Sequence, residues 1–478
     1  MLGSAIAAAA VAASMTTAIV TTDHAVLRAS PRDSAPQQAQ LWQGELLEVR
    51  GERLDYLQVW DHATERGGYV KASQVRRTAL APQEAPQLLT VLRFLHDAPG
   101  AESLGIALAA AWLQAADAQT LRGASGAEAL DALGTFAERL AQRASEGSAT
   151  AQGKAALAGH LEVAAHYGVQ FASYEQEGRV RICYDGEAFR GVLALPADPQ
   201  QQARAVLALT QPECVDPALR PLQRHERNAW RAQVLERVDA AALPAYLRHR
   251  IALRRAAVWS TLAYENARFG EAAQPAAERA IAALASVPKG ELAEEDQASY
   301  NDAAMRVNAS RWAAVPASTP PAGAGPAIVT QAGAPGETCV LLVDGKHDAA
   351  NPLARRCTYA LVWPQSASLN REGNALALAV QPMDAWRELW LFRLRGRQWV
   401  IDVLPPATLQ PQLGYAEFAG WVPGGRQMLL AREARGEGRY RRSNEVVALD
   451  SLVAAPAAAG LWQRWQDPKW KGMSVAVR

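Results

Sequence analysis

The 478-residue sequence predicts a multidomain α+β protein, because the spacing of its apolar residues changes twice along the chain. The first region alternates polar and apolar residues, a long middle region repeats apolar residues at helical spacing, and the last region alternates again. We therefore expect a small N-terminal β-barrel, a central all-α helical domain with one β-hairpin, and a C-terminal antiparallel β domain of blade-like sheets or a sandwich. The expected segments are a signal-like segment (1–16), the barrel (17–80), the helical domain (84–314), a Pro/Gly/Ala linker (315–337) and the β domain with an aromatic tail (338–478).

The composition is that of a folded protein and argues against a nucleic-acid partner. Hydrophobic residues make up 49% of the sequence and charged residues 20%. The formal net charge is only +1, and no basic stripe with interleaved aromatic residues is present. The apolar runs are shorter than the ~20 residues of a membrane-spanning helix, so we expect no transmembrane span. We also expect no cofactor, because the glycines of 316–337 follow no strand and precede no Gly-Lys-Ser/Thr.

The N-terminus resembles a secretory signal. Residues 2–13 form a short apolar run that ends in small residues, although no lysine or arginine precedes Arg28. The alternative is an ordinary alanine-rich helix. Export would place the chain in the periplasm or outside the cell.

The four cysteines support export. Four cysteines allow three pairings. We favour the disulfides Cys183–Cys214 and Cys339–Cys357, because each closes a loop within its own domain. The alternative is four buried, reduced thiols. No Cys-x-x-Cys and no nearby histidine pair is present, so we expect no metal site. Disulfides favour an oxidising compartment such as the bacterial periplasm.

The first sixty residues after the signal-like segment read as short strands. In "YLQVW", Leu57 and Val59 share one face of a strand, while Tyr56, Gln58 and Trp60 share the other. Turn signals such as "SPRDS", "RGERLD" and "ATERGG" separate the strands. Several short strands in a meander predict a small barrel.

These residues resemble a bacterial SH3-like (SH3b) domain. The runs "AVLRASP", "LWQGELLEV", "YLQVW", "GGYV" and "ASQV" follow the order of that family's strands. Tyr56 or Leu57, and also Tyr69, stand where the family usually has tryptophan. The resemblance implies a module that contacts peptidoglycan or a protein peptide. The whole chain resembles uncharacterised proteobacterial SH3-domain-containing proteins, which implies no activity. The matching positions are Arg28, Pro31, Gly44, Val49, Val59, Gly68 and Val70.

Three aromatic residues of this module are candidate ligand contacts. Trp42, Tyr56 and Trp60 could form an exposed platform that stacks on sugar rings or peptides. The alternative is that at least one of them closes the core of the barrel.

The helical domain contains one β interruption. Leu88, Leu92 and Leu95 form an apolar helical stripe near its start. In contrast, the stretch 168–186 alternates, with Val180 on the same face as Ile182, and predicts a hairpin.

The last region reads as eight strands with hairpin connections, and two of its stretches are similar to each other. "SLNREGNALALAV" and "GWVPGGRQMLLAREA" each place a glycine turn before a strongly apolar strand. They resemble blades of Tol-type and WD-like β-propellers, with Gly373 and Gly425 at the turn position. A closed propeller needs about four or more blades, and the region is too short to form them. We expect a small sandwich, or a fragment that a partner completes.

No catalytic constellation is visible in the sequence. It contains no Gly-x-Ser-x-Gly and no cysteine–histidine pair near a turn. His160 and His166 lie six residues apart and point to different faces of one helix. Each histidine is expected at a surface or a helix end. We expect a non-catalytic binding or scaffold protein of the cell envelope, with peptidoglycan or an envelope protein as partner. The alternative is a peptidoglycan-targeted hydrolase with an unrecognised site in the helical domain.

Overall fold

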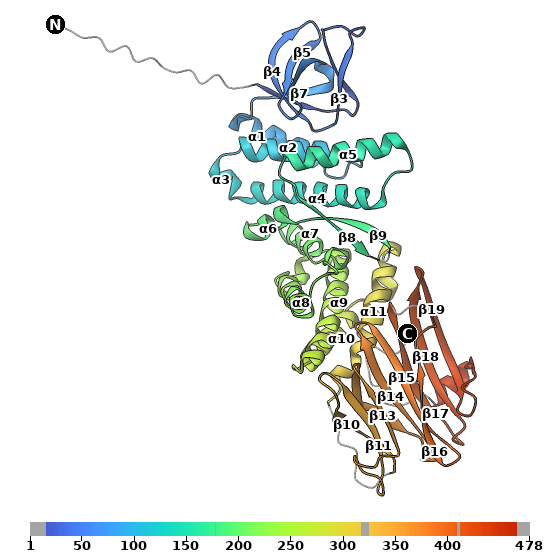
Figure 1. The fold of residues 1–478 in the computed structure, drawn as a ribbon. Helices are drawn as coiled ribbons and strands as arrows, with labels where there is room; N and C mark the ends of the chain where they lie inside the picture. The colour runs from blue at the N-terminus through green and yellow to red at the C-terminus, as the bar shows by residue number, and fades with distance from the viewer. Residues whose placement is uncertain (1–15, 177, 317–324, 409–411, 466–478) are drawn as a thin grey trace, which may run out of the picture. The chain divides into compact units, whose positions relative to one another are not determined.

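The computed structural model describes residues 16–176, 178–316, 325–408 and 412–465 (Figure 1). The chain forms two compact units, residues 1–219 and 220–478. The expected mixed α+β architecture is confirmed: an antiparallel sheet comes first, helices follow, and sheets end the chain. The helical region is divided between the two units, however, and does not form one domain. The signal-like segment lies outside the described residues, except for Thr16.

The first unit begins with a seven-stranded antiparallel sheet in the order β3-β2-β6-β5-β4-β1-β7, here called the N-terminal sheet. As the alternation predicts, Leu57 and Val59 are buried, and residues from six strands meet in the same core, so the sheet curls around it. The strands are β1 (Thr17–Val20), β2 (Ala25–Arg28), β3 (Gln37–Leu41), β4 (Leu46–Arg53), β5 (Tyr56–Asp61), β6 (Arg66–Lys71) and β7 (Val75–Thr78).

Helices pack below this sheet within the same unit. Helix α2 is apolar on nearly all sides and lies in the centre of the helical core, which explains its continuous apolar run. Ile19 of β1 belongs to this helical core and not to the core of the sheet. The helices are α1 (Ala85–Leu95), α2 (Glu102–Ala115), α3 (Ala118–Leu121), α4 (Ala124–Glu146), α5 (Ala151–His166), α6 (Glu187–Ala194) and α7 (Pro199–Leu209).

The predicted hairpin interrupts these helices. It consists of β8 (Phe171–Gln176) and β9 (Arg179–Tyr184). Ser145 of α4 accepts a hydrogen bond from the backbone N of Ile182 (2.8 Å) and fixes β9 to the helix. The disulfide Cys183–Cys214 ties β9 to the turn that follows α7, as predicted.

The second unit begins with four helices and continues with three- and eight-stranded sheets. Its helices are α8 (Pro221–Glu236), α9 (Ala245–Phe269), α10 (Gln274–Ala285) and α11 (Gln297–Ser310), followed by the 3-10 turn η7 (Arg311–Ala314). The smaller sheet contains β10 (Ala327–Ala332), β11 (Thr338–Val343) and β12 (Ala354–Thr358). The larger sheet contains β13 (Leu361–Leu369), β14 (Ala375–Met383), β15 (Trp386–Arg395), β16 (Gln398–Leu404), β17 (Leu413–Val422), β18 (Gln427–Gly436), β19 (Arg439–Ala448) and β20 (Ala454–Pro456).

Two boundary predictions in this region are wrong. The expected linker, 315–337, contains β10, which pairs with β11 and buries Ile328. The alternating sequence "AIVTQA" of this strand is flanked by prolines and glycines. The high Pro, Gly and Ala content of 315–337 therefore predicted a linker although the stretch contains a short strand. The alternation also predicts that "CTYALVWP" (357–364) is one of the eight C-terminal strands, but this stretch divides between β12 and β13 of different sheets.

Strand β14 of the larger sheet is buried on both faces. In β14, Ala375 and Ala377 pack against β17–β19, whereas Leu376 and Leu378 pack toward β10–β12. Both faces of the strand are therefore apolar, which explains the uninterrupted run "ALALAV". The turn glycines of the two similar stretches have positive φ values, 69° at Gly373 and 65° at Gly425.

The outer face of β17–β18 is covered by helix α12 (Ala459–Trp465). Trp462 and Trp465 of α12 pack near Leu429 and Ala431. These two tryptophans of the aromatic tail therefore pack on the β domain. Residues 466–478 of that tail lie outside the described residues.

A buried ionic cluster joins α11 and η7 to the larger sheet. Glu417 of β17 forms ion pairs with Arg311 of η7 (3.1 Å) and with Arg387 of β15. Trp312 Nε1 donates to both oxygens of the same carboxylate (3.2 Å). The side chains of Arg311, Arg387 and Glu417 are at most 2% exposed, so one carboxylate compensates two buried guanidinium groups.

Both predicted disulfides are present, since Cys339 of β11 is joined to Cys357 of β12. Two disulfides are typical of proteins in oxidising compartments. Across the described ranges, no helix combines the length and the apolar character that crossing a bilayer requires.

Replacing Glu417 by alanine should lower the free energy of unfolding by about 3–5 kcal/mol, because it leaves two guanidinium groups buried without their counter-ion. Glu295, which pairs with Arg250 at the surface, gives a matched control in the same unit. Glu295→Ala should cost less than about 1 kcal/mol. Chemical denaturation of the full chain measures both, and equal effects would contradict the account.

Candidate functional site

Trp42 does not point outward but lies between the N-terminal sheet and helix α5. A Cβ atom added to Gly159 of α5 would lie 2.5 Å from Trp42 Cδ1, so the indole ring rests directly on the helix backbone. The ring also meets His24 edge-on, with centroids 5.0 Å apart, and His160 at 6.4 Å. The side chain is half-buried. Trp42 thus holds the sheet against the helices.

Hydrogen bonds surround this contact. His160 of α5 is buried and bonds Asp23 (Nε2–Oδ1 2.8 Å). Ser103 Oγ donates to the carbonyl of Gln43 (2.8 Å), and Tyr167 donates to the carbonyl of Gly44 (2.9 Å). We call this region the docking junction. It consists of the loops 21–24 and 42–45 and of the residues of α2 and α5 that contact these loops.

Gly44 is required at the centre of the docking junction. Its φ is +95°, a conformation that favours glycine, and an added Cβ would lie 2.6 Å from the carbonyl oxygen of Ser103. Gly44 is also one of the positions at which the sequence resembles the SH3b family. In this chain the same glycine also allows two backbones to touch.

Two carboxyl groups in the docking junction have shifted pKa values. Burial raises the pKa of Glu45 to about 7, and its neighbours Asp61 and Glu162 add to the rise, although the backbone N of Trp42 donates to it (3.0 Å). Burial is also the largest single influence on Asp23 and raises its pKa, but the hydrogen bonds from His160 and from the backbone N of Gln43, together with the nearby histidines, lower the pKa overall. At pH 7 roughly half of the Glu45 carboxyl groups are therefore protonated in the folded chain.

Tyr56 and Trp60 lie elsewhere on the sheet. Tyr56 is only 2% exposed, and its hydroxyl donates to Asp33 Oδ1 (2.6 Å). Trp60 is half-buried, with the guanidinium of Arg50 over its ring at 4.5 Å. Within the described ranges no ring contact joins Trp42, Tyr56 and Trp60. They do not form the expected exposed platform, and a ligand contact by any one of them stays a prediction.

The end of the sheet away from the docking junction carries an unusual residue. Arg53 pairs with Tyr56, so Leu54 and Asp55 form a two-residue hairpin turn between β4 and β5. Leu54 has a φ of 61° and is 80% exposed. Turns of this length usually have glycine or asparagine where φ is positive. The sequence "RGERLD" predicts the turn, but nothing in it shows that a leucine takes the strained position.

Polar groups lie beside this turn. Lys71 Nζ donates to Asp33 Oδ2 (2.9 Å), next to the Tyr56 hydroxyl, and the backbone N of Ala72 donates to the carbonyl of Asp55 (2.9 Å). The carboxylate of Asp33 is 69% exposed. We call this region, residues 29–36, 53–56 and 71–74, the free end of the N-terminal sheet.

A hollow of about 590 Å³ lies where α4 ends and α5 begins. Leu157, Leu161 and Ile182 contribute apolar surface, and Glu146 and Lys154 contribute one charge each. No histidine and no second carboxylate is among the residues that line it. This lining does not supply the paired acid and base that a hydrolase would use.

The chain matches no protein-family model, no curated protein and no solved structure.

Gly159→Ala should destabilise the first unit by about 1–3 kcal/mol, because the new methyl group overlaps the ring of Trp42. In a Trp42→Ala background the same change should cost almost nothing, since the ring that it meets is gone. Denaturation of the four proteins of this double-mutant cycle measures the coupling. Additive effects would mean that Trp42 does not rest on α5.

The stability of the first unit should fall as pH rises from about 4.5 to about 7. Across this window the unfolded chain has lost the proton of Glu45 while the folded chain still holds it, because the folded pKa is raised from 4.5 to about 7. The loss should be on the order of 3 kcal/mol. Glu45→Gln should remove this part of the pH dependence. Denaturation at a series of pH values tests it, and identical profiles for both proteins would contradict the assignment.

Proposed function

We propose that this chain is an exported, non-catalytic binding protein of the cell envelope that contacts peptidoglycan through the free end of its N-terminal sheet. The observation that carries the proposal is Leu54, a large apolar side chain that is exposed and also held at positive φ. An exposed leucine alone is ordinary. At this position glycine would adopt the positive φ with less backbone strain than leucine. An exposed leucine here is therefore better explained by a role in binding than by a role in folding.

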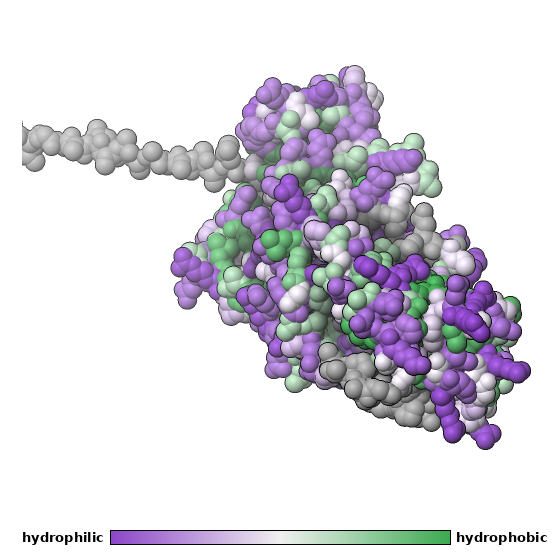
Figure 2. Space-filling view, turned by 60° about the horizontal axis from the view of Figure 1, so that its bottom comes forward, coloured by the Kyte–Doolittle hydropathy of each residue, from purple (hydrophilic) through white to green (hydrophobic). Residues whose placement is uncertain are grey.

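The surroundings of Leu54 suit an amphipathic ligand. Peptidoglycan presents sugar rings and short peptides, which offer apolar surface, hydrogen-bonding groups and charges. Leu54 supplies the apolar contact, while Asp33 and Lys71 supply a carboxylate and an ammonium group next to it. On the face drawn in Figure 2, hydrophilic residues predominate over the N-terminal sheet. A polar surface with one apolar contact favours a wet, specific interface over a large hydrophobic one.

The docking junction supports a binding role because it fixes the orientation of the free end. Trp42, Gly44 and His160 hold the opposite end of the sheet against α2 and α5. A surface that is already ordered loses less conformational entropy when a ligand binds. The helices therefore act as the scaffold on which the sheet is presented.

Export is part of the same proposal. The two disulfides fit an extracytoplasmic protein. Peptidoglycan lies outside the cytoplasm, so the proposed ligand and the oxidised cysteines belong to the same side of the inner membrane. The periplasm is the compartment that we propose.

One observation favours the alternative, a peptidoglycan hydrolase. The second ring nitrogen of His160, Nδ1, is buried and has no hydrogen-bond partner in the described part of the chain, while Nε2 bonds Asp23. A histidine oriented by a carboxylate is a common general base. Release of soluble muropeptides from sacculi by the purified chain, abolished by His160→Gln, would replace the binding proposal with this one.

Leu54→Gly should abolish binding to purified peptidoglycan sacculi while leaving the fold at least as stable, because glycine accepts the φ of this turn without strain. We expect the sacculus-bound fraction to fall at least about tenfold, which corresponds to about 1.4 kcal/mol. Co-sedimentation of the full chain with sacculi measures the bound fraction, and chemical denaturation measures stability.

Glu65→Gly is the matched control. Glu65 is exposed, has a φ of 53° and lies in the β5–β6 turn at the other end of β5. The Glu65→Gly substitution should relieve the same kind of backbone strain without changing the fraction of protein bound to sacculi. Unchanged binding of Leu54→Gly, or equal loss in both variants, would refute the proposed surface.

A further inference from the structure

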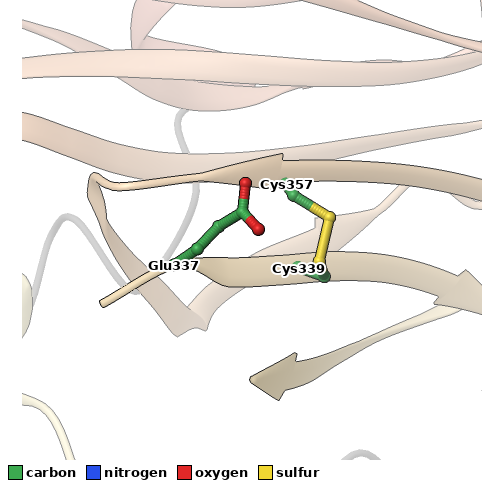
Figure 3. Close-up of side chains that lie close together, drawn as sticks. All are labelled: Glu337, Cys339 and Cys357. Atoms are coloured by element: carbon green, nitrogen blue, oxygen red, sulfur yellow. A yellow bond between two sulfur atoms is a disulfide. The ribbon is translucent and has the colours of Figure 1, made fainter. Parts of the chain in front are cut away.

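Three potential metal-ligating groups meet on one face of the smaller C-terminal sheet (Figure 3). The carboxylate of Glu337 and the sulfur atoms of Cys339 and Cys357 lie within 4.8 Å of one another. Strand geometry explains the meeting. Glu337 and Cys339 are two residues apart and share a face, and Cys357 is the direct antiparallel partner of Cys339.

The three groups are partly buried: Glu337 and Cys357 are half-buried, and the residues of the adjoining turn are exposed. Cys339 is completely buried, and the backbone N of Ala334 donates to Glu337 Oε2 (3.0 Å). A Cβ atom added to Gly333 would overlap Glu337 Oε2 and lie 3.1 Å from Cys339 Sγ. The missing side chain of Gly333 therefore lets the Glu337 carboxylate and the Cys339 sulfur lie against its backbone, and the Ala334 backbone N fixes the position of the carboxylate.

The other disulfide has no such third group. Cys183 Sγ lies near the backbone carbonyl of Glu213 (3.8 Å), and Cys214 Sγ lies near the amide oxygen of Gln211 (3.3 Å). Among the described residues, the only group of three or more possible metal ligands is the one at Glu337. The two cysteine pairs of this chain thus differ in their chemistry.

We propose that Cys339, Cys357 and Glu337 bind one Zn²⁺-like divalent cation when the Cys339–Cys357 disulfide is reduced. A dithiol reductant breaks the S–S bond, transfers two electrons and two protons to form two thiols, and itself becomes a disulfide. The cation then displaces both thiol protons and is held by two thiolates and one carboxylate. Water takes the fourth position of a tetrahedral site.

The spacing of the strands permits both states. Zn–S bonds of ~2.3 Å in a tetrahedral site separate two sulfur atoms by roughly 3.8 Å. The Cα atoms of Cys339 and Cys357 lie 3.8 Å apart, so rotation of the two side chains can bring the sulfur atoms to this separation. Either the covalent bond or the metal would join β12, the edge strand of this sheet, to β11.

Arg355 opposes the metal. Its Nη2 lies 3.4 Å from Cys339 Sγ on the same face of β12. A guanidinium group stabilises a thiolate but repels a cation at the same distance. Arg355→Gln should therefore strengthen metal binding in the reduced chain, whereas a purely structural disulfide predicts no effect.

The test uses full chains that retain one cysteine pair each. The double variant Cys183→Ser/Cys214→Ser keeps the proposed site, and Cys339→Ser/Cys357→Ser keeps the control pair. Each is reduced with a phosphine, desalted and titrated with Co²⁺, whose thiolate charge-transfer and tetrahedral d–d absorption report the ligands. Circular dichroism checks the fold. If the first variant does not fold, the reduced wild-type chain replaces it.

We expect one Co²⁺ per chain, displaced by Zn²⁺, only where the Cys339–Cys357 pair is present and reduced. Glu337→Gln should weaken the affinity by at least about tenfold. The proposal is overturned if the reduced site shows no thiolate absorption, if the control pair binds equally, or if Glu337→Gln leaves the affinity unchanged.

Discussion

The first unit depends on the close approach of two backbones, made possible by glycine at two points. Gly44 touches the backbone of Ser103 in α2, and Gly159 of α5 leaves space for the ring of Trp42. A side chain at either position would separate the sheet from the helices. Because these contacts lie at one end of the N-terminal sheet, the opposite end, here called the free end, faces away from the helices. The proposed function uses this free end.

Buried charge has a comparable role in the second unit. Glu417 brings Arg311 and Arg387, which come from a helix terminus and from a strand, to one point inside the structure. Burial lowers the pKa of Arg387 to about 10, which leaves the guanidinium charged at neutral pH. Such a cluster adds little stability compared with apolar packing, but it is costly to break. It specifies how α11 and η7 lie on β15 and β17.

Much of the fold could be predicted from local patterns. Alternation located the N-terminal strands, the β8–β9 hairpin and the C-terminal strands, and loop closure within each region gave both disulfides. Several of the failures concern contacts between distant segments. Trp42 has the sequence features of an exposed aromatic residue but is half-buried against α5, and His160 has those of a helix surface but is buried against the loops of the N-terminal sheet. Periodicity also could not separate the helices of the two units, because both sets have the same apolar spacing. The unusual position of Leu54 was not predicted, because a turn-forming sequence indicates neither the φ angle nor the exposure of each residue in the turn.

The most direct test of the account is amide hydrogen exchange of the full chain, followed by mass spectrometry of peptides from the two ends of the N-terminal sheet. We predict that amides of residues 42–45 and 159–163 exchange slowly. Trp42→Ala should accelerate exchange in both segments together, while the turn at 54–55 should not change. If residues 42–45 exchange rapidly in the wild-type chain, or if Trp42→Ala leaves α5 unaffected, the sheet is not docked on the helices and the account is wrong.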